Sequence, residues 1–218
     1  MEVNNLDNEH SDSKYCNLRF LSNSLNSCLL DGDDIHLGHY LDSYKELKKF
    51  CHLMGSVFGF VASEIESKTG ILEQFRKEDE CGNFVTMKNM IKHEKDQGVL
   101  KNINYISGCR TLLLLNRGLD FLKTFLQRIS KLNPNEGTAS VGKQSYEETL
   151  AHHHVWYVRA GARLAMITMP SKQNLLNYVL GDTQDCMLQY LPEVVEAANR
   201  VHARTYNTLK AHNLLELA

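Results

Sequence analysis

The chain carries a small number of side chains whose type and spacing could bind a polar ligand. Glu64 and Lys68 are four residues apart, so on a helix they share one face. Spacing alone is typical of a solvated ion pair, which contributes about 0.3–0.5 kcal/mol. The same groups could also serve a ligand, because a carboxylate accepts hydrogen bonds and an ammonium is a compact partner for a phosphate.

A second candidate position is Arg110, which is followed four residues later by Leu114. The planar guanidinium can bind two phosphate oxygens, and each charge-assisted bond contributes about 1.5–3 kcal/mol. Taken by itself, Arg110 also fits the commoner pattern of a surface or helix-terminal arginine. Leu114 lies on the same helix face but offers neither a charge nor an aromatic ring.

Catalytic and metal-binding patterns are weak in this sequence. The three consecutive histidines 152–154 would point about 100° apart on a helix, so they cannot all face one ion. None of the six cysteines forms a Cys-x-x-Cys pair. We therefore expect no metal site and no cofactor, and the absence of a nucleophile–base pair favours a protein that is not an enzyme.

The elements that must position these residues have helical periodicity. One stripe runs from Leu47 to Ile65 in steps of three and four residues and predicts one helix face. Further stripes run through 112–129, 155–169 and 187–201, and the second of these ends against Pro170, which stops a helix. Signals for strands are nearly absent. The pattern predicts an all-α domain of about eight helices.

Composition excludes several classes of protein. The chain has 218 residues, 43% of them hydrophobic and 23% charged, with a net charge of −2, and it has no long basic block for nucleic acid. Its longest apolar run, 112–115, is far shorter than the roughly 20 residues of a membrane span. Residues 1–14 read as a flexible polar tail without signal-peptide character, which leaves 15–218 as the folded domain and a cytoplasmic location as the expectation.

Three segments together resemble the glycolipid transfer protein family. The segment 107–126 is similar to the central helix of that family, including its Arg-Gly-Leu turn at 117–119. In 145–156 a histidine lies two residues before a tryptophan, and 55–68 resembles the helix with the head-group acid and its partner. The order and spacing also fit, and the resemblance extends from about residue 17 to the C-terminal helix.

The resemblance implies a fold and a function. The expected fold is a two-layer, all-α sandwich with a head-group site at the surface and an apolar lipid pocket behind it. The expected function is the transfer of one sphingolipid at a time between membranes, without chemical conversion. The expected partners are therefore the sphingolipid ligand and a membrane surface contacted reversibly, and we expect the protein to be a monomer.

Individual residues take their roles from the same resemblance. Glu64 stands where the family has an aspartate that accepts hydrogen bonds from the sphingoid amide and hydroxyl. Lys68 and Arg110 match the ceramide-1-phosphate branch, in which they bind the phosphate. His154 matches the histidine expected to donate to the acyl-amide carbonyl. Trp156, the only tryptophan, matches a residue at the membrane-facing rim, although a lone aromatic residue is more often part of a core.

Two positions depart from the family pattern. The carboxylate of Glu64 stands about one bond farther from the backbone than that of an aspartate. Leu114 occupies the position at which the ceramide-1-phosphate branch has a second arginine and the glycolipid branch a sugar-stacking tryptophan. The leading hypothesis is therefore transfer of ceramide-1-phosphate. The alternatives are a carrier of a simple glycolipid or a phospholipid, and a lipid-sensing helical adaptor that does not transfer its ligand.

Overall fold

The structure describes residues 14–217, and most of these residues lie in helices. The structure is a computed structural model, and the side chains of Ser56, Val57, Cys186 and Met187 are not described. The predicted tail therefore lies outside the described residues, except for Lys14. The α-helices are α1 (Leu18–Ser27), α2 (Leu37–Leu53), α3 (Ser56–Glu78), α4 (Met87–Asp96), α5 (Gly108–Ser130), α6 (Ala139–Thr149), α7 (Trp156–Ile167), α8 (Lys172–Leu180), α9 (Gln184–Met187) and α10 (Leu191–Ala211).

Short elements connect these helices. Two strands of two residues each, β1 (Leu29–Leu30) and β2 (Asp34–Ile35), pair antiparallel with Leu29 opposite Ile35. The remaining short elements are the 3₁₀ turns η1 (Asp31–Asp33), η2 (Val99–Lys101), η3 (Ala151–His153), η4 (Gly181–Thr183) and η5 (Leu188–Tyr190). The fold class predicted from periodicity is therefore confirmed, with this small hairpin as an addition.

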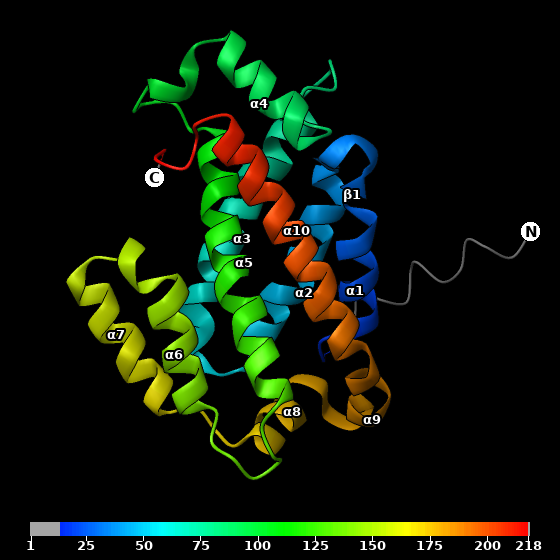
Figure 1. The fold of residues 1–218 in the computed structure, drawn as a ribbon, viewed down its shortest axis with the longest axis vertical. Helices are drawn as coiled ribbons and strands as arrows, with labels where there is room; N and C mark the ends of the chain where they lie inside the picture. The colour runs from blue at the N-terminus through cyan, green and yellow to red at the C-terminus, as the bar shows by residue number, and fades with distance from the viewer. Residues whose placement is uncertain (1–13, 218) are drawn as a thin grey trace, which may run out of the picture.

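The helices pack in two layers. In Figure 1, α1, α5 and α10 lie toward the viewer, while α2 and α3 lie behind them. Helix α5 packs against α10 and α6 within its layer and against α3 in the other layer, and α7 packs on the outer side of α6. None of the helices described here is both long and apolar enough to cross a membrane.

Helix α5 is the central element of this arrangement. The apolar stripe predicted for it is buried along its whole length, and Phe125 is completely inaccessible to solvent. The helix begins where the hydroxyl of Ser107 accepts a hydrogen bond from the backbone N–H of Arg110, as expected for an N-cap serine. Helix α5 is buried on several of its faces, because it packs against α3, α6 and α10.

A buried carboxylate also holds the first turn of α5. Glu94 of α4 is fully buried and accepts hydrogen bonds from the Ser107 hydroxyl at 2.7 Å and from the backbone N–H groups of Gly108 at 2.5 Å and Cys109 at 3.0 Å. A side chain at position 108 would collide with the sulfur of Met90, so glycine permits this close approach. The negative charge also suits the positive end of the helix dipole.

The prediction that residues 47–65 form one face of a single helix was wrong, because two helices share this stretch. Helix α2 ends at Leu53 and α3 begins at Ser56, and Gly55 between them has a φ of +105°. This conformation is open to glycine but strained for other residues. The stripe nevertheless marks buried positions on both helices, because α2 and α3 pack against each other.

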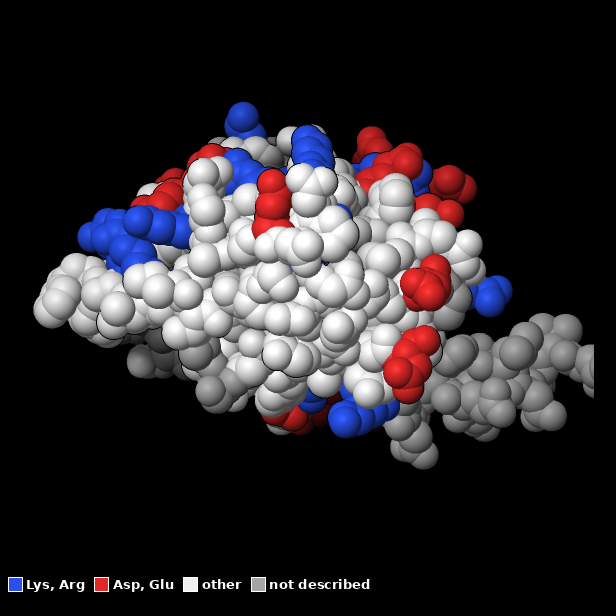
Figure 2. Space-filling model, turned by 90° about the horizontal axis from the view of Figure 1, so that it is seen from below, with Lys and Arg blue, Asp and Glu red and all other residues white. Residues whose placement is uncertain are grey.

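The end of the molecule at which α8 and α9 lie carries few charges across its middle. Figure 2 shows this end, with most of the basic and acidic side chains gathered around the edge of the view. The middle of the described part of this face therefore does not present a concentrated block of one charge.

Candidate functional site

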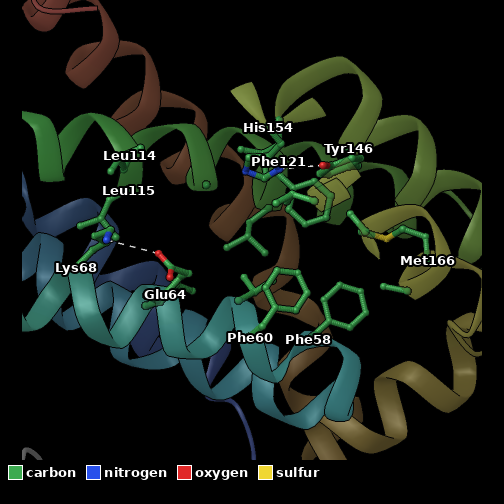
Figure 3. Close-up of a pocket in the computed structure, with 18 of the residues that line it drawn as sticks. Phe58, Phe60, Glu64, Lys68, Leu114, Leu115, Phe121, Tyr146, His154 and Met166 are labelled. Atoms are coloured by element: carbon green, nitrogen blue, oxygen red, sulfur yellow. Dashed lines mark hydrogen bonds and ion pairs between the residues drawn. The ribbon is translucent and has the colours of Figure 1, made fainter. Parts of the chain in front are cut away.

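A largely apolar cavity with a volume of about 190 Å³ lies between the two layers. Helices α3, α5 and α7 contribute most of its lining, together with one residue each of α2 and α6 (Figure 3). The apolar and aromatic lining side chains are Tyr44, Phe58, Phe60, Val61, Ile65, Leu114, Leu115, Phe121, Leu122, Tyr146, Leu150, Val158, Ala162, Ala165 and Met166. Such a lining suits hydrocarbon rather than a polar metabolite.

Polar side chains occur at the rim of this cavity. Glu64 and Lys68 of α3 both line it, and the Lys68 ammonium lies 3.5 Å from a Glu64 carboxylate oxygen (Figure 3). The Glu64 side chain is 70% exposed and that of Lys68 is 26% exposed, so a ligand can reach the pair from solvent. Leu114 of α5 lines the same cavity and is partly exposed.

His154 lies across the cavity from this pair, between η3 and α7. Its Nδ1 is 2.8 Å from the hydroxyl of Tyr146, and the two rings are tilted with centroids 5.7 Å apart. Burial lowers the pKa of His154, so the imidazole is neutral at neutral pH. The structure therefore brings four of the predicted head-group residues, Glu64, Lys68, Leu114 and His154, to one cavity.

Arg110 does not line the cavity in this structure. Its Nε donates to the carbonyl of Leu217 at 2.8 Å, and its Nη1 donates to the carbonyl of Tyr105 at 3.3 Å. Arg117, two turns farther along α5, donates to the carbonyl of Leu215 at 3.1 Å. Both arginines therefore hold the segment that follows α10 against α5, where the chain ends in Figure 1.

Trp156 lies outside the cavity, at the start of α7, and is 73% exposed. The adjacent Val155 and Tyr157 are also exposed, as are Leu164 and Ile167 on the same helix. Positions 156, 160, 164 and 167 follow helical spacing, so this apolar stripe runs along one outer face of α7. Sequence inspection identified Trp156 alone, although the spacing of Leu164 and Ile167 would have indicated them.

Tyr146 and Glu94 were missed by sequence inspection. Tyr146 is almost completely buried, and its partner His154 is eight residues away in a different element. Among the described residues, no three histidine, cysteine or acidic side chains converge as a metal site would require.

Comparison with known proteins shows the family to which this chain belongs. The sequence pattern of the glycolipid transfer protein family matches residues 35–181. The chain belongs to this family. A ceramide-1-phosphate transfer protein of Xenopus tropicalis is 30% identical over 199 residues, covering 89% of this chain and 93% of the relative.

Solved structures of the family have the same architecture. The apo form of mouse ceramide-1-phosphate transfer protein is 26% identical, with a TM-score of 0.86 over 93% of this chain and 100% of the mouse chain. The human protein in complex with 12:0 ceramide-1-phosphate is 28% identical, with a TM-score of 0.82 over 93% of this chain and 99% of the human chain. The family resemblance and the two-layer, all-α fold that it implied are confirmed.

Proposed function

We propose that this chain binds one sphingolipid and transfers it between membranes, with ceramide-1-phosphate as the cargo. The observation that supports this most directly is one cavity with an apolar interior and a rim that carries Glu64, Lys68 and His154. The relatives at 26–30% identity whose names include ceramide-1-phosphate, one of them solved with that lipid, support the same cargo.

In the proposed transfer, the polar residues at the rim of the cavity select the cargo, rather than its apolar interior. Burying hydrocarbon is favourable by about 0.8 kcal/mol per methylene relative to water. A lipid that moves from a bilayer into the cavity exchanges one apolar environment for another, so this gain largely cancels. Buried polar groups left without partners then penalise the wrong head group.

In the proposed complex, the Glu64 carboxylate accepts from the amide and hydroxyl of the sphingoid base. The Lys68 ammonium leaves its ion pair with Glu64 and binds the phosphate, for which a compact charge is well suited. His154 donates to the acyl-amide carbonyl. Arg110 joins the phosphate site only by exchanging its bond with Leu217 for one with the ligand.

The size of the cavity implies that it widens on binding. Its volume of about 190 Å³ is below the about 300–1,000 Å³ of ordinary ligand pockets. Small side chains on α7, Ala162 and Ala165, line it together with Phe58 and Phe60 of α3. Separation of α7 from α3 would therefore admit the acyl and sphingoid chains.

Replacing Lys68 with glutamine is expected to slow the transfer of ceramide-1-phosphate between vesicles by about ten- to a hundredfold. The reason is the loss of a charge-assisted hydrogen bond worth about 1.5–3 kcal/mol. Transfer of galactosylceramide should change little. Lys48→Gln is the matched control, because Lys48 forms an exposed ion pair with Glu66 and does not line the cavity.

The same vesicle assay tests the cargo itself. The wild-type protein is expected to transfer ceramide-1-phosphate faster than galactosylceramide, and lipid recovered after transfer should have an unchanged mass. Equal or reversed rates would reject ceramide-1-phosphate in favour of a simple glycolipid. Binding without transfer would instead favour a lipid-sensing adaptor.

We further propose that the outer face of α7 contacts the membrane reversibly, with the protein acting as a monomer at cytoplasmic membrane surfaces. Trp156 supplies an amphipathic ring suited to the head-group level, and the exposed Leu164 and Ile167 extend the apolar stripe. Arg163 is bound to Glu147 through two hydrogen bonds and therefore adds little net charge there.

Replacing Trp156 with alanine is expected to weaken vesicle binding several-fold, because the largest exposed apolar group of this face is lost. Sedimentation with vesicles measures this effect, and binding of a short-chain lipid in solution should stay unchanged. Tyr178→Ala on α8 is a suitable control, since Tyr178 is also an exposed aromatic residue but lies outside the stripe. Equal losses in the two variants would argue against docking through α7.

A further inference from the structure

The hydroxyl of Tyr146 lies where it can control which nitrogen of His154 carries the proton. Tyr146 is 3% exposed, and both residues line the cavity (Figure 3). The separation of 2.8 Å between the hydroxyl and Nδ1 is that of a good hydrogen bond. The second ring nitrogen, Nε2, is then the one left to meet a ligand.

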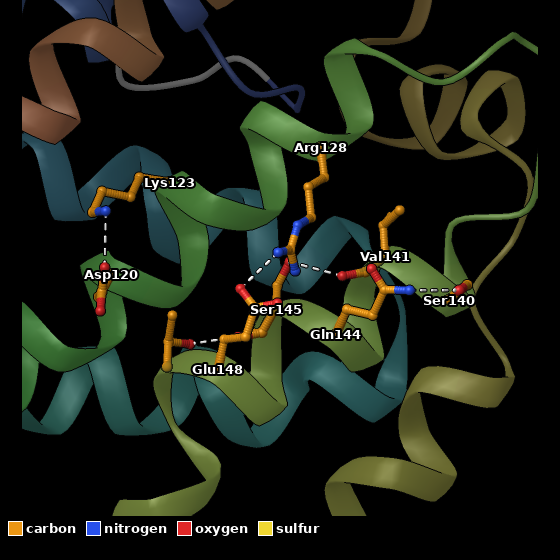
Figure 4. A network of polar contacts seen from close by, with 9 residues as sticks. Asp120, Lys123, Arg128, Ser140, Val141, Gln144, Ser145 and Glu148 are labelled. Atoms are coloured by element: carbon orange, nitrogen blue, oxygen red, sulfur yellow. Dashed lines mark hydrogen bonds and ion pairs between the residues drawn. The ribbon is translucent and has the colours of Figure 1, made fainter.

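The position of Tyr146 is fixed by its surroundings. Its ring packs edge-to-face on Phe121 of α5, with centroids 6.5 Å apart and an interplanar angle of 82°. The preceding residue, Ser145, accepts a hydrogen bond from Arg128 of α5 at 3.2 Å, and Arg128 also binds Glu148 at 2.6 Å (Figure 4). Helix α6 is therefore tied to α5 on both sides of Tyr146, so the hydroxyl has a defined place.

The direction of the hydrogen bond follows from the available acceptors. Within the described part of the chain, His154 is the hydrogen-bond partner that the Tyr146 hydroxyl has. Burial raises the pKa of Tyr146 and lowers that of His154, so a neutral phenol faces a neutral imidazole. If Nδ1 carried the proton, the phenol proton would be left in an apolar cavity without an acceptor, at a cost of about 1–3 kcal/mol. The hydroxyl therefore donates to Nδ1.

We propose that Tyr146 is a positioning residue that holds His154 in the tautomer with the proton on Nε2, so that the site presents a donor to a carbonyl oxygen of the cargo. The identity of that carbonyl rests on the proposed function, whereas the tautomer does not. With Glu64 as an acceptor on the opposite side of the cavity, Glu64 and His154 together offer one acceptor and one donor. This pair is complementary to a secondary amide, which has both an N–H and a C=O.

The tautomer can be measured on the lipid-free protein by the ¹⁵N chemical shifts of the His154 ring, with His154→Gln used to assign the signals. The wild-type protein is expected to show a protonated Nε2 and an unprotonated Nδ1. Tyr146→Phe keeps the ring packed on Phe121 and should shift both nitrogens toward a mixture of tautomers. A wild-type Nδ1–H signal, or shifts unaffected by Tyr146→Phe, would overturn the proposal.

A double-mutant cycle tests the consequence for binding. The two ligands are ceramide-1-phosphate and a dialkyl ether phosphatidic acid, which has the phosphate and two chains but no carbonyl. Tyr146→Phe is expected to lower affinity for the first about five- to tenfold and for the second little, with no further loss in a His154→Ala background. Additive losses in the double variant, or equal losses for both ligands, would overturn the positioning role. If the wild-type protein bound neither ligand, the proposed cargo would be refuted. The ¹⁵N measurement on the lipid-free protein would still decide the tautomer of His154.

Discussion

Replacing Leu114 with arginine is expected to raise affinity for ceramide-1-phosphate by about ten- to a hundredfold. Leu114 lines the cavity that contains Lys68 and is 36% exposed, so a longer side chain at this position has access to solvent and to the rim. A guanidinium there would add a charge-assisted hydrogen bond to a phosphate oxygen, worth about 1.5–3 kcal/mol. Titration of the protein with vesicles containing the phosphorylated lipid measures the change.

The control for this variant is Val85→Arg, which adds the same charge at an exposed position outside the cavity. It separates binding at the site from general attraction to an anionic surface, which also falls with added salt. Unchanged or weaker binding by Leu114→Arg would mean that this position does not face the head group. An equal gain in both variants would assign the effect to the membrane surface.

Replacing Glu94 with alanine is expected to lower the free energy of unfolding by about 3 kcal/mol or more. Three donors at the start of α5 would lose their acceptor in a fully buried place, and each unsatisfied donor costs about 1–3 kcal/mol. Urea unfolding measures the loss, and Glu94→Gln should lose less because one acceptor oxygen remains. Glu66→Ala is the control, because Glu66 is 65% exposed in a surface ion pair that contributes about 0–1 kcal/mol. Equal stabilities of Glu94→Ala and Glu66→Ala would contradict the capping role.

Much of the fold was predictable because helical periodicity records burial directly. The stripe through Leu115, Leu122 and Ile129 has the spacing of one helix face, and all three side chains are buried on α5. The break at Gly55 was not predictable from the stripe, since two packed helices can bury residues at the same spacing as one. Its signal was the glycine itself, and glycine also occurs inside helices.

The candidate site was only partly predictable. Glu64, Lys68, Leu114 and His154 came from the family resemblance, and the structure brings them to one cavity. The partners of Arg110 are backbone carbonyls, one five residues earlier at Tyr105 and one in the distant C-terminal segment at Leu217, and such partners cannot be inferred from residue types. The family resemblance, together with the chemistry of a guanidinium, made Arg110 a candidate for phosphate, and its use as an anchor for Leu217 emerges only from the folded chain.

The carboxylate of Glu94 also limits where on α5 a phosphate group can bind. A helix N-terminus is a ready site for a phosphate, but that of α5 is already filled from within the chain. In the proposed complex, selectivity depends on rim residues such as Lys68 and Leu114, and neither of them caps the start of α5. Under this proposal, substitutions at the rim can alter the preferred ligand while the capped start of α5 stays intact.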